Sequence, residues 1–395
     1  MMPGPMDGVR VVELANFVAA PSGSALMADL GADVIKIEPP GGDGWRYRLA
    51  FADGIGPQFN HDNRGKRSIV LDITTSAGAE TARTLIGTAD VLLTNLLPAR
   101  RRRLGFDPDT LLAACPNLVY VGVTGYGADG PDADRPGFDY SAFWASSGVM
   151  GKLAPPDEPP PLARGAIGDH TTGVTNLAAT LAALRLRDRN GKGQIVELSL
   201  FSVGQWFNST DIVGAAVSGV EPAVHDRCRP FNPLWNTYRC ADGHWLLLTM
   251  LQPDLYWARF CRAIGHPEWL ERHEWASAQE RASDSERLTA AIDAEFAGAG
   301  RAEWSARLDR EGVIYAPVST VLEVVERPQT LAQQTIQTPP GSRQPVVRTP
   351  FEIRGADLRP RGPAPELGRH TEEVLLELGL DWDQIAALRQ QGAFG

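Results

Sequence analysis

The chain has 395 residues, 43% of them hydrophobic, a formal net charge of −10, and four cysteines scattered without metal-ligand spacing. This composition is typical of a globular protein with two or three domains, and it argues against a nucleic-acid partner and a metal site. Because no apolar run approaches about 18 residues and no basic N-terminal segment precedes an apolar one, we expect no membrane partner and a cytoplasmic location.

Apolar strand patterns alternate with helix patterns through the first 200 residues. The predicted strands lie at 9–14, 34–38, 68–73, 91–96, 118–124 and 194–200. The main helix patterns between them cover 20–30, 75–89, 108–114 and 171–189. Such alternation is typical of a parallel sheet with helices on both faces. We therefore predict an α/β fold whose large, Rossmann-like domain spans residues 1–200.

The pattern changes after residue 200. A helix-like stretch leads into an irregular one, and we interpret 201–224 as a linker. Residues 225–326 contain a hairpin pattern, helix patterns and a strand, which predict a smaller α+β domain. Residues 327–346 are rich in Pro, Gln and Thr and are interpreted as a second linker. The C-terminal segment 347–395, with one strand-like stretch and two short helices, is expected to return to the large domain.

Asp169 lies in the segment 163–173, just before the long helix pattern. One interpretation is a helix N-cap, whose carboxylate accepts hydrogen bonds from the first free backbone N–H groups. The other is a carboxylate nucleophile whose ionised form is stabilised by the positive end of the helix. The two interpretations are compatible. His170 resembles an acid–base partner, but adjacent residues at a helix start point apart, so we do not expect it to pair with Asp169.

Positive charge gathers beyond one predicted strand. Four consecutive arginines, Arg100 to Arg103, follow the strand at 91–96, where open α/β sheets bind ligands. Guanidinium groups match phosphate oxygens, but no more than two of the four can face one ligand from a helical turn. The loop 41–44 is either an anion cradle of backbone N–H groups or a plain surface loop. The turn after the first strand lacks G-x-G-x-x-G, which argues against an NAD or FAD site.

Ordered sequence blocks between residues 7 and 205 carry a resemblance to a known family. They include Leu30-Gly-Ala-Asp-Val-Ile-Lys-Ile-Glu, Asn63-Arg-Gly-Lys-Arg-Ser, Asp134-Arg-Pro-Gly-Phe-Asp-Tyr and Gly168-Asp-His-Thr-Thr-Gly. These blocks resemble the family III CoA transferases, the group that includes formyl-CoA transferase, carnitine CoA transferase and α-methylacyl-CoA racemase. The resemblance covers the first half of the chain densely and the rest more weakly.

The resemblance implies a reaction and a set of site residues. It implies that Asp169 attacks an acyl-CoA thioester to give a mixed anhydride and CoA thiolate, which then forms an aspartyl–CoA thioester and frees the acid. A carboxylic acid acceptor then runs these reaction steps in reverse. It also implies an interlocked homodimer and a site in which coenzyme A, as acyl-CoA, contacts eight residues. These are Asn16, Phe17, Val18, Ala19, Lys66, Arg67, Asn95 and Arg103.

Two departures from the family narrow the reaction. Racemases of the family carry His in a Gly-His-Asp motif, whereas this chain has Phe138 between Gly137 and Asp139, and phenylalanine cannot transfer a proton. Formyl-CoA transferase has a glycine-rich flap, but the comparable stretch 226–233 has no glycine run. We therefore predict an acyl-CoA:carboxylate CoA transferase with donor and acceptor open. The alternatives are an acyl-CoA racemase or isomerase, and a CoA-binding protein without turnover.

Overall fold

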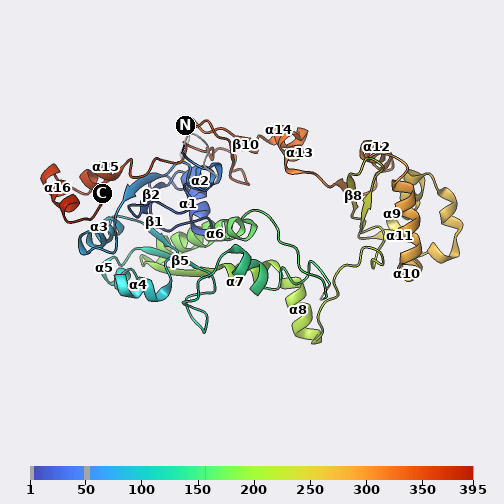
Figure 1. Cartoon of the computed structure of the whole chain (residues 1–395), viewed down its shortest axis with the longest axis horizontal. Helices are drawn as coiled ribbons and strands as arrows, with labels where there is room; N and C mark the ends of the chain where they lie inside the picture. The colour runs from blue at the N-terminus through green and yellow to red at the C-terminus, as the bar shows by residue number, and fades with distance from the viewer. Residues whose placement is uncertain (1–3, 49–53, 156, 395) are drawn as a thin grey trace. The chain divides into compact units, whose positions relative to one another are not determined.

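The computed structural model describes residues 4–48, 54–155 and 157–394, which divide into two compact units (Figure 1). Unit 1 runs to Pro222 and resumes at Thr330, and unit 2 comprises Ala223–Gln329. Among the helices of the described residues, none combines the length and the apolar character that a membrane span needs.

Unit 1 is built on a six-stranded parallel sheet with the order β3-β2-β1-β4-β5-β6. Its strands are β1 (Arg10–Leu14), β2 (Asp33–Glu38), β3 (Arg67–Val70), β4 (Val91–Thr94), β5 (Val119–Thr124) and β6 (Gln194–Ser199). This result confirms the predicted parallel α/β sheet. Since strand order reverses between β1 and β4, the carboxyl ends of these two strands form the switch point at which such sheets bind ligands.

Helices cover both faces of the sheet. The helices of this part of unit 1 are α1 (Ala19–Asp29), α2 (Pro57–Asn63), α3 (Ser76–Ile86), α4 (Pro98–Leu104), α5 (Pro108–Ala114), the π-helix η1 (Asp139–Ser146), α6 (Ile167–Asn190), α7 (Leu200–Phe207) and α8 (Ser209–Ser218), of which α8 buries no residue. Successive strand side chains point to opposite faces, so Val11 joins the core under α1 and α6 while Val12 joins the core under α3. The sheet therefore has one hydrophobic core on each of its two faces.

Glycines bring α1 and α6 into close contact. A Cβ atom on Gly173 would lie 2.2 Å from Ser22 Oγ, and one on Gly23 would lie 2.5 Å from Asn176 Nδ2. Any side chain at either glycine would push the helices apart, because closely packed interiors leave no room for it. This contact fixes the start of α6, which carries Asp169, against α1.

The C-terminal segment packs on the core of unit 1. It contains β10 (Ile336–Gln337), β11 (Val346–Val347), α15 (Thr371–Glu377) and α16 (Trp382–Gln390). The His370 N–H donates to the Ser68 carbonyl oxygen at 2.9 Å, and Val374 and Ile385 complete the core under α3. Figure 1 shows α15 and α16 beside α3, although they are far from it in sequence.

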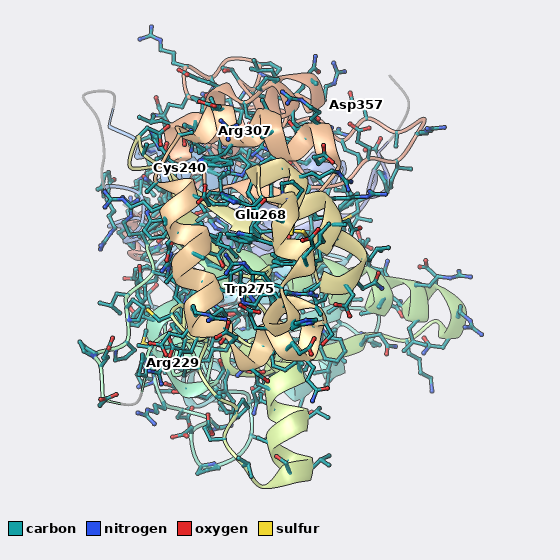
Figure 2. All side chains as sticks on the ribbon, turned by 90° about the vertical axis from the view of Figure 1, so that its right-hand side faces the viewer. Arg229, Cys240, Glu268, Trp275, Arg307 and Asp357 are labelled. Atoms are coloured by element: carbon teal, nitrogen blue, oxygen red, sulfur yellow. The ribbon has the colours of Figure 1, made fainter. Side chains whose placement is uncertain are left out.

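Unit 2 is a small three-stranded antiparallel sheet with helices. Its elements are β7 (Thr237–Arg239), β8 (Trp245–Leu248), β9 (Tyr315–Pro317), α9 (Pro253–Ile264), η2 (Pro267–Glu271), η3 (His273–Trp275), α10 (Ala278–Ser283), α11 (Ser285–Phe296), α12 (Arg301–Glu311) and α13 (Val321–Glu326), and α14 (Pro328–Gln333) follows at its boundary. Indole rings fill its core. Trp275, labelled among the helices in Figure 2, packs on Trp257 and Trp269.

A buried ion network ties the strands of unit 1 to the loops that follow them. Glu13 accepts from Lys36 Nζ and from Lys66 Nζ, each at 2.7 Å, and Lys36 also pairs with Asp43 at 2.9 Å. Burial alone would raise the pKa of Glu13, but the two lysines lower it to about 2. Burial lowers the pKa of Lys66 to about 8. Removal of one member would leave uncompensated charge in the core, which is far more costly than loss of an exposed pair.

We therefore expect Glu13→Gln to lower the free energy of unfolding by about 3–5 kcal/mol, since two buried lysines then lack their shared counter-ion. The measurement is urea unfolding followed by circular dichroism. Glu80→Gln, on the exposed surface of α3, is the control and should change stability by less than about 0.5 kcal/mol. Equal effects of the two substitutions would contradict the role given to the network.

Candidate active site

A pocket of about 250 Å³ opens at the switch point of the sheet in unit 1. Segments after β1, β4 and β5 supply most of its wall, and the starts of α6 and α7 complete it. The lining includes Asn16, Phe17, Ala19, Asn95, Leu97, Arg100, Thr124, Gly125, Phe138 and Asp169. The pocket therefore brings together residues from distant parts of the sequence at the edge where ligands of parallel sheets bind.

Asn95 joins the two loops that flank the switch point. Its Nδ2 donates to the Asn16 carbonyl oxygen at 2.8 Å, and its Oδ1 accepts from the Asn16 N–H at 3.2 Å. The next N–H, that of Phe17, donates to Asp43 Oδ1 at 3.1 Å. Phe17 has a φ of +65°, a conformation that costs a non-glycine residue about 1–3 kcal/mol. The surrounding hydrogen bonds hold it there, with its ring at the pocket.

The loop 41–44 does not form an anion cradle. Asp43 fills that role itself, since its Oδ1 accepts from the N–H groups of Phe17 and Trp45 and its Oδ2 pairs with Lys36. The loop thus carries its own anion, which is buried. Of the two interpretations offered by the sequence, the phosphate-binding one is excluded for this loop.

Asp169 lies in the first turn of α6 and lines the pocket. The prediction that it is the N-cap was wrong, because the helix begins at Ile167 and its N-cap is Ala166. Burial, the carboxylates of Asp139 and Asp62, and only partial compensation by His170 raise the pKa of Asp169 to about 7. The helix start therefore does not keep this carboxylate fully ionised at neutral pH, contrary to the prediction.

Asp139 is the second carboxyl group at the start of α6, and the sequence identified it only as part of the Gly-Phe-Asp motif. A Cβ atom on Gly168 would lie 2.2 Å from Asp139 Oδ1, so only glycine leaves room for it there. Burial raises the pKa of Asp139, although the N–H groups of Gly168 and Asp169 act in the opposite direction. Two carboxyl groups with raised pKa values therefore lie at the start of α6.

The imidazole of His170 extends toward α2. Its Nε2 lies 2.9 Å from Asp62 Oδ1, and its ring meets that of His61 edge-to-face with centroids 5.5 Å apart. The donor atoms of these three side chains all lie within 4.8 Å of one another. Asp62 and His170 are thus within hydrogen-bond distance of each other, and the expected absence of a metal stays a prediction.

The four consecutive arginines of α4 have different environments. Arg101 is buried and donates to Glu197 at 2.7 Å, and Arg102 pairs with Asp134 at 3.5 Å. Arg100 lines the pocket, and Arg103 is exposed. Because residues three apart share a helix face, Arg100 and Arg103 form one cationic face of α4, and Arg100 lines the pocket.

The structure does not bring Lys66 and Arg67 to the pocket. Lys66 Nζ is buried and donates to Glu13, to Asn63 Oδ1 and to the Pro21 carbonyl oxygen. Arg67 begins β3 and therefore lies at the amino edge of the sheet, where it pairs with Asp33 and with Glu377. Lys66 precedes β3 and Arg67 is its first residue, and the two side chains reach different partners.

Of the other residues that the sequence selected, Asn16, Phe17, Ala19 and Asn95 line the pocket. Val18 is buried and occupies the N-cap position of α1. Phe138, where racemases of the resembled family carry His, packs edge-to-face on Phe17 with ring centroids 5.6 Å apart. The first turn of α1 leaves backbone N–H groups without helical partners, as every helix start does, and it borders the pocket.

Comparison with known proteins gives a consistent identification. The profile of CoA-transferase family III matches residues 6–371. The (R)-2-hydroxy-4-methylpentanoate CoA-transferase of Clostridioides difficile is 31% identical over 96% of this chain and 97% of its own length. The succinate–glutarate CoA-transferase of Agrobacterium fabrum is 31% identical over 95% of this chain and 96% of its own.

A solved structure gives the same result. The crystal structure of a CAIB/BAIF family protein from Brucella suis has a TM-score of 0.86 and 31% sequence identity to this chain, and the match covers 95% of this chain and 100% of that one. Both the sequence profile and the fold thus extend over nearly the whole chain. The chain belongs to CoA-transferase family III and is a CoA-transferase.

Proposed function

We propose that this enzyme transfers CoA from an acyl-CoA thioester to a carboxylate acceptor through a covalent intermediate on Asp169. The observation that carries the proposal is the place of Asp169, whose side chain lines the switch-point pocket beside the start of α1. The relatives support the substrate class, because their names describe CoA transfer involving hydroxy acids and dicarboxylic acids. Donor and acceptor acids vary among them, so we propose the class and not one pair.

The proposed reaction begins with the ionised carboxylate. A carboxylate oxygen of Asp169 attacks the thioester carbonyl and the C–S bond breaks. This step forms a mixed anhydride on Asp169 and releases CoA as the thiolate. The thiolate then attacks the aspartyl carbonyl, which frees the original acid and leaves an aspartyl–CoA thioester. The acceptor carboxylate repeats both steps in reverse. A carboxylate is a weak nucleophile, so positioning and exclusion of water contribute most of the rate.

Residues around the pocket support a binding mode for acyl-CoA. The loop Asn16–Ala19 and the free N–H groups at the start of α1 suit the developing negative oxygen or the thiolate. The cationic face of Arg100 and Arg103 suits the phosphates of CoA. Asn95 would act by holding the loop, since its amide is already used by Asn16. Lys66 and Arg67 are left out of this proposal because each is engaged elsewhere.

We also propose that the enzyme is an interlocked homodimer, with segments 201–224 and 327–346 as the linkers between a large domain, a small domain and a returning C-terminal segment. Apolar side chains along α7 and α8 support a partner surface. They include Trp206, which is 77% exposed in the single chain, Phe207, Val213 and Val217. Apolar residues exposed together on neighbouring helices mark an interaction site more often than single exposed apolar residues do.

Asp169→Asn should fold, bind CoA and lose transfer by about a thousandfold or more, because the amide keeps the shape but removes the nucleophile. In the wild-type enzyme, incubation with an acyl-CoA donor alone followed by hydroxylamine should label Asp169, as read by peptide mass spectrometry. Asp188→Asn, exposed near the other end of α6, is the control and should leave both results unchanged. A label on another residue would overturn the mechanism.

Arg100→Ala and Arg103→Ala should each weaken CoA binding by about 1–3 kcal/mol, since each removes a charge-assisted contact to a phosphate. Isothermal titration calorimetry measures the CoA affinity. The difference in affinity between wild type and variant should shrink as the salt concentration rises. Arg102→Ala is the matched control because this side chain pairs with Asp134. Unaltered affinity in both test variants would exclude the cationic face of α4 as the phosphate site.

A chiral 2-methylacyl-CoA incubated with the enzyme in D₂O should show little enzyme-dependent deuteration at the α-carbon. Phe138 occupies the place of the second base that racemisation needs, and its ring carries no exchangeable proton. Mass spectrometry of the recovered acyl-CoA is the measurement, with the same sample minus enzyme as the control. Exchange as fast as CoA transfer would favour the racemase or isomerase instead.

A further inference from the structure

The start of α6 is surrounded by charged side chains from three elements. Asp139 comes from η1, His170 from α6 itself, and Asp62 from α2. Asp62 has a side chain only 2% exposed, and it accepts from His170 Nε2 at 2.9 Å. Arg64, the nearest arginine in sequence, is engaged instead by Asp29 at 2.7 Å. The charge of Lys66 also acts on Asp62, but its Nζ donates to Glu13, whereas the imidazole of His170 is hydrogen-bonded to Asp62 itself.

We propose that Asp62 holds His170 as an imidazolium immediately beside Asp169, and that this cation keeps Asp169 ionised enough to act as the nucleophile. The inference rests on the proposed role of Asp169 and assigns two positioning residues to it. Neither His170 nor Asp62 lines the pocket, so both act through Asp169 and not on the substrate.

The charge balance around Asp169 supports this role. Burial raises its pKa first, the carboxylates of Asp139 and Asp62 raise it further, and His170 opposes them. Arg64 lies near His61, whose pKa is lowered to about 4 by burial and by that guanidinium, so His61 is neutral at pH 7 and gives no help. Desolvation lowers the pKa of His170, but the hydrogen bond and charge of Asp62, with Asp169 and Asp139, raise it overall.

The sign of the expected effect follows from this balance. Removal of the His170 charge leaves burial and both carboxylates unopposed, so the pKa of Asp169 rises. A smaller fraction of Asp169 is then ionised at a given pH, and the acid limb of the transfer activity moves to higher pH. A neighbouring charge that is partly exposed typically shifts a pKa by about 0.5–1 unit. The loss should therefore be about three- to tenfold at pH 6 and under about twofold at pH 8.5.

The test compares pH profiles of kcat/KM for the wild type, His170→Gln and His170→Lys, all in EDTA. His170→Gln keeps a donor toward Asp62 but removes the charge, so its acid limb should move up. His170→Lys restores a cation and should bring the limb back. His266→Gln is the matched control, since His266 also pairs with carboxylates, Glu268 and Glu295, but belongs to unit 2. Its profile should equal that of the wild type.

Two spectroscopic readouts separate this inference from the proposed function. In ¹³C NMR of labelled aspartate, the Asp169 carboxyl should titrate at higher pH in His170→Gln than in the wild type, whether or not the enzyme turns over. In Asp62→Asn, the His170 imidazole should titrate at lower pH than in the wild type. Absence of an adduct on Asp169 would defeat the proposed function while leaving these shifts measurable.

Three outcomes would overturn the inference. The first is an unmoved acid limb together with an unmoved Asp169 titration in His170→Gln. The second is an equal loss of activity at every pH that His170→Lys fails to rescue, which would make His170 a structural residue. The third is wild-type activity that disappears in EDTA and returns with zinc, which would assign His61, Asp62 and His170 to a cation instead.

Discussion

The position of the first pocket loop in unit 1 depends on the buried carboxylate of Glu13. It is fully buried between two lysines, one from β2 and one just before β3, and it also accepts from the hydroxyl of Ser24 on α1. Through Lys36 the network reaches Asp43, which in turn fixes the N–H of Phe17. One ionic cluster thus sets the position of the first loop of the pocket, and its charges cannot be removed singly without large cost.

The same low-dielectric surroundings shape the chemistry at Asp169. Burial strengthens its interactions with every nearby charge, but it also favours the protonated form. In the proposed mechanism Asp169 is a poorly solvated nucleophile, and its pKa of about 7 leaves it ionised only in part near neutrality. As we propose, His170 held by Asp62 adjusts this ionisation, and neither residue lines the pocket.

Much of the architecture follows from local patterns in the sequence. Apolar strand runs and intervening helices predicted the parallel sheet, and a parallel sheet already indicates where a ligand binds. The position of Asp169 near a helix start was visible in the same way. The exact first turn was not, because Gly168 and Ile167 lie inside the helix, where a glycine normally signals its limit. Close packing against η1 explains that glycine, and only the structure reveals such packing.

Residues that act at a distance in sequence could not be found from patterns. Asp62 lies 108 positions before its partner His170, and no local signal links them. Lys66 and Arg67, which the resemblance implies as CoA contacts, do not line the pocket, and their role in binding stays a prediction. Lys66 is buried against Glu13, and Arg67 lies at the amino edge of the sheet. A sequence shows where the charged residues are, but the fold decides which partners they reach.

The left-handed backbone at Phe17 has a consequence for how this enzyme can evolve. Glycine at position 17 would relax the backbone. It would also free the loop to sample many shapes, and it would remove one ring of the Phe17–Phe138 pair. The loop instead stores strain in a single shape that exists before any ligand arrives. Substitutions selected only for thermal stability would therefore drift toward glycine at this position and lose the preformed wall of the pocket.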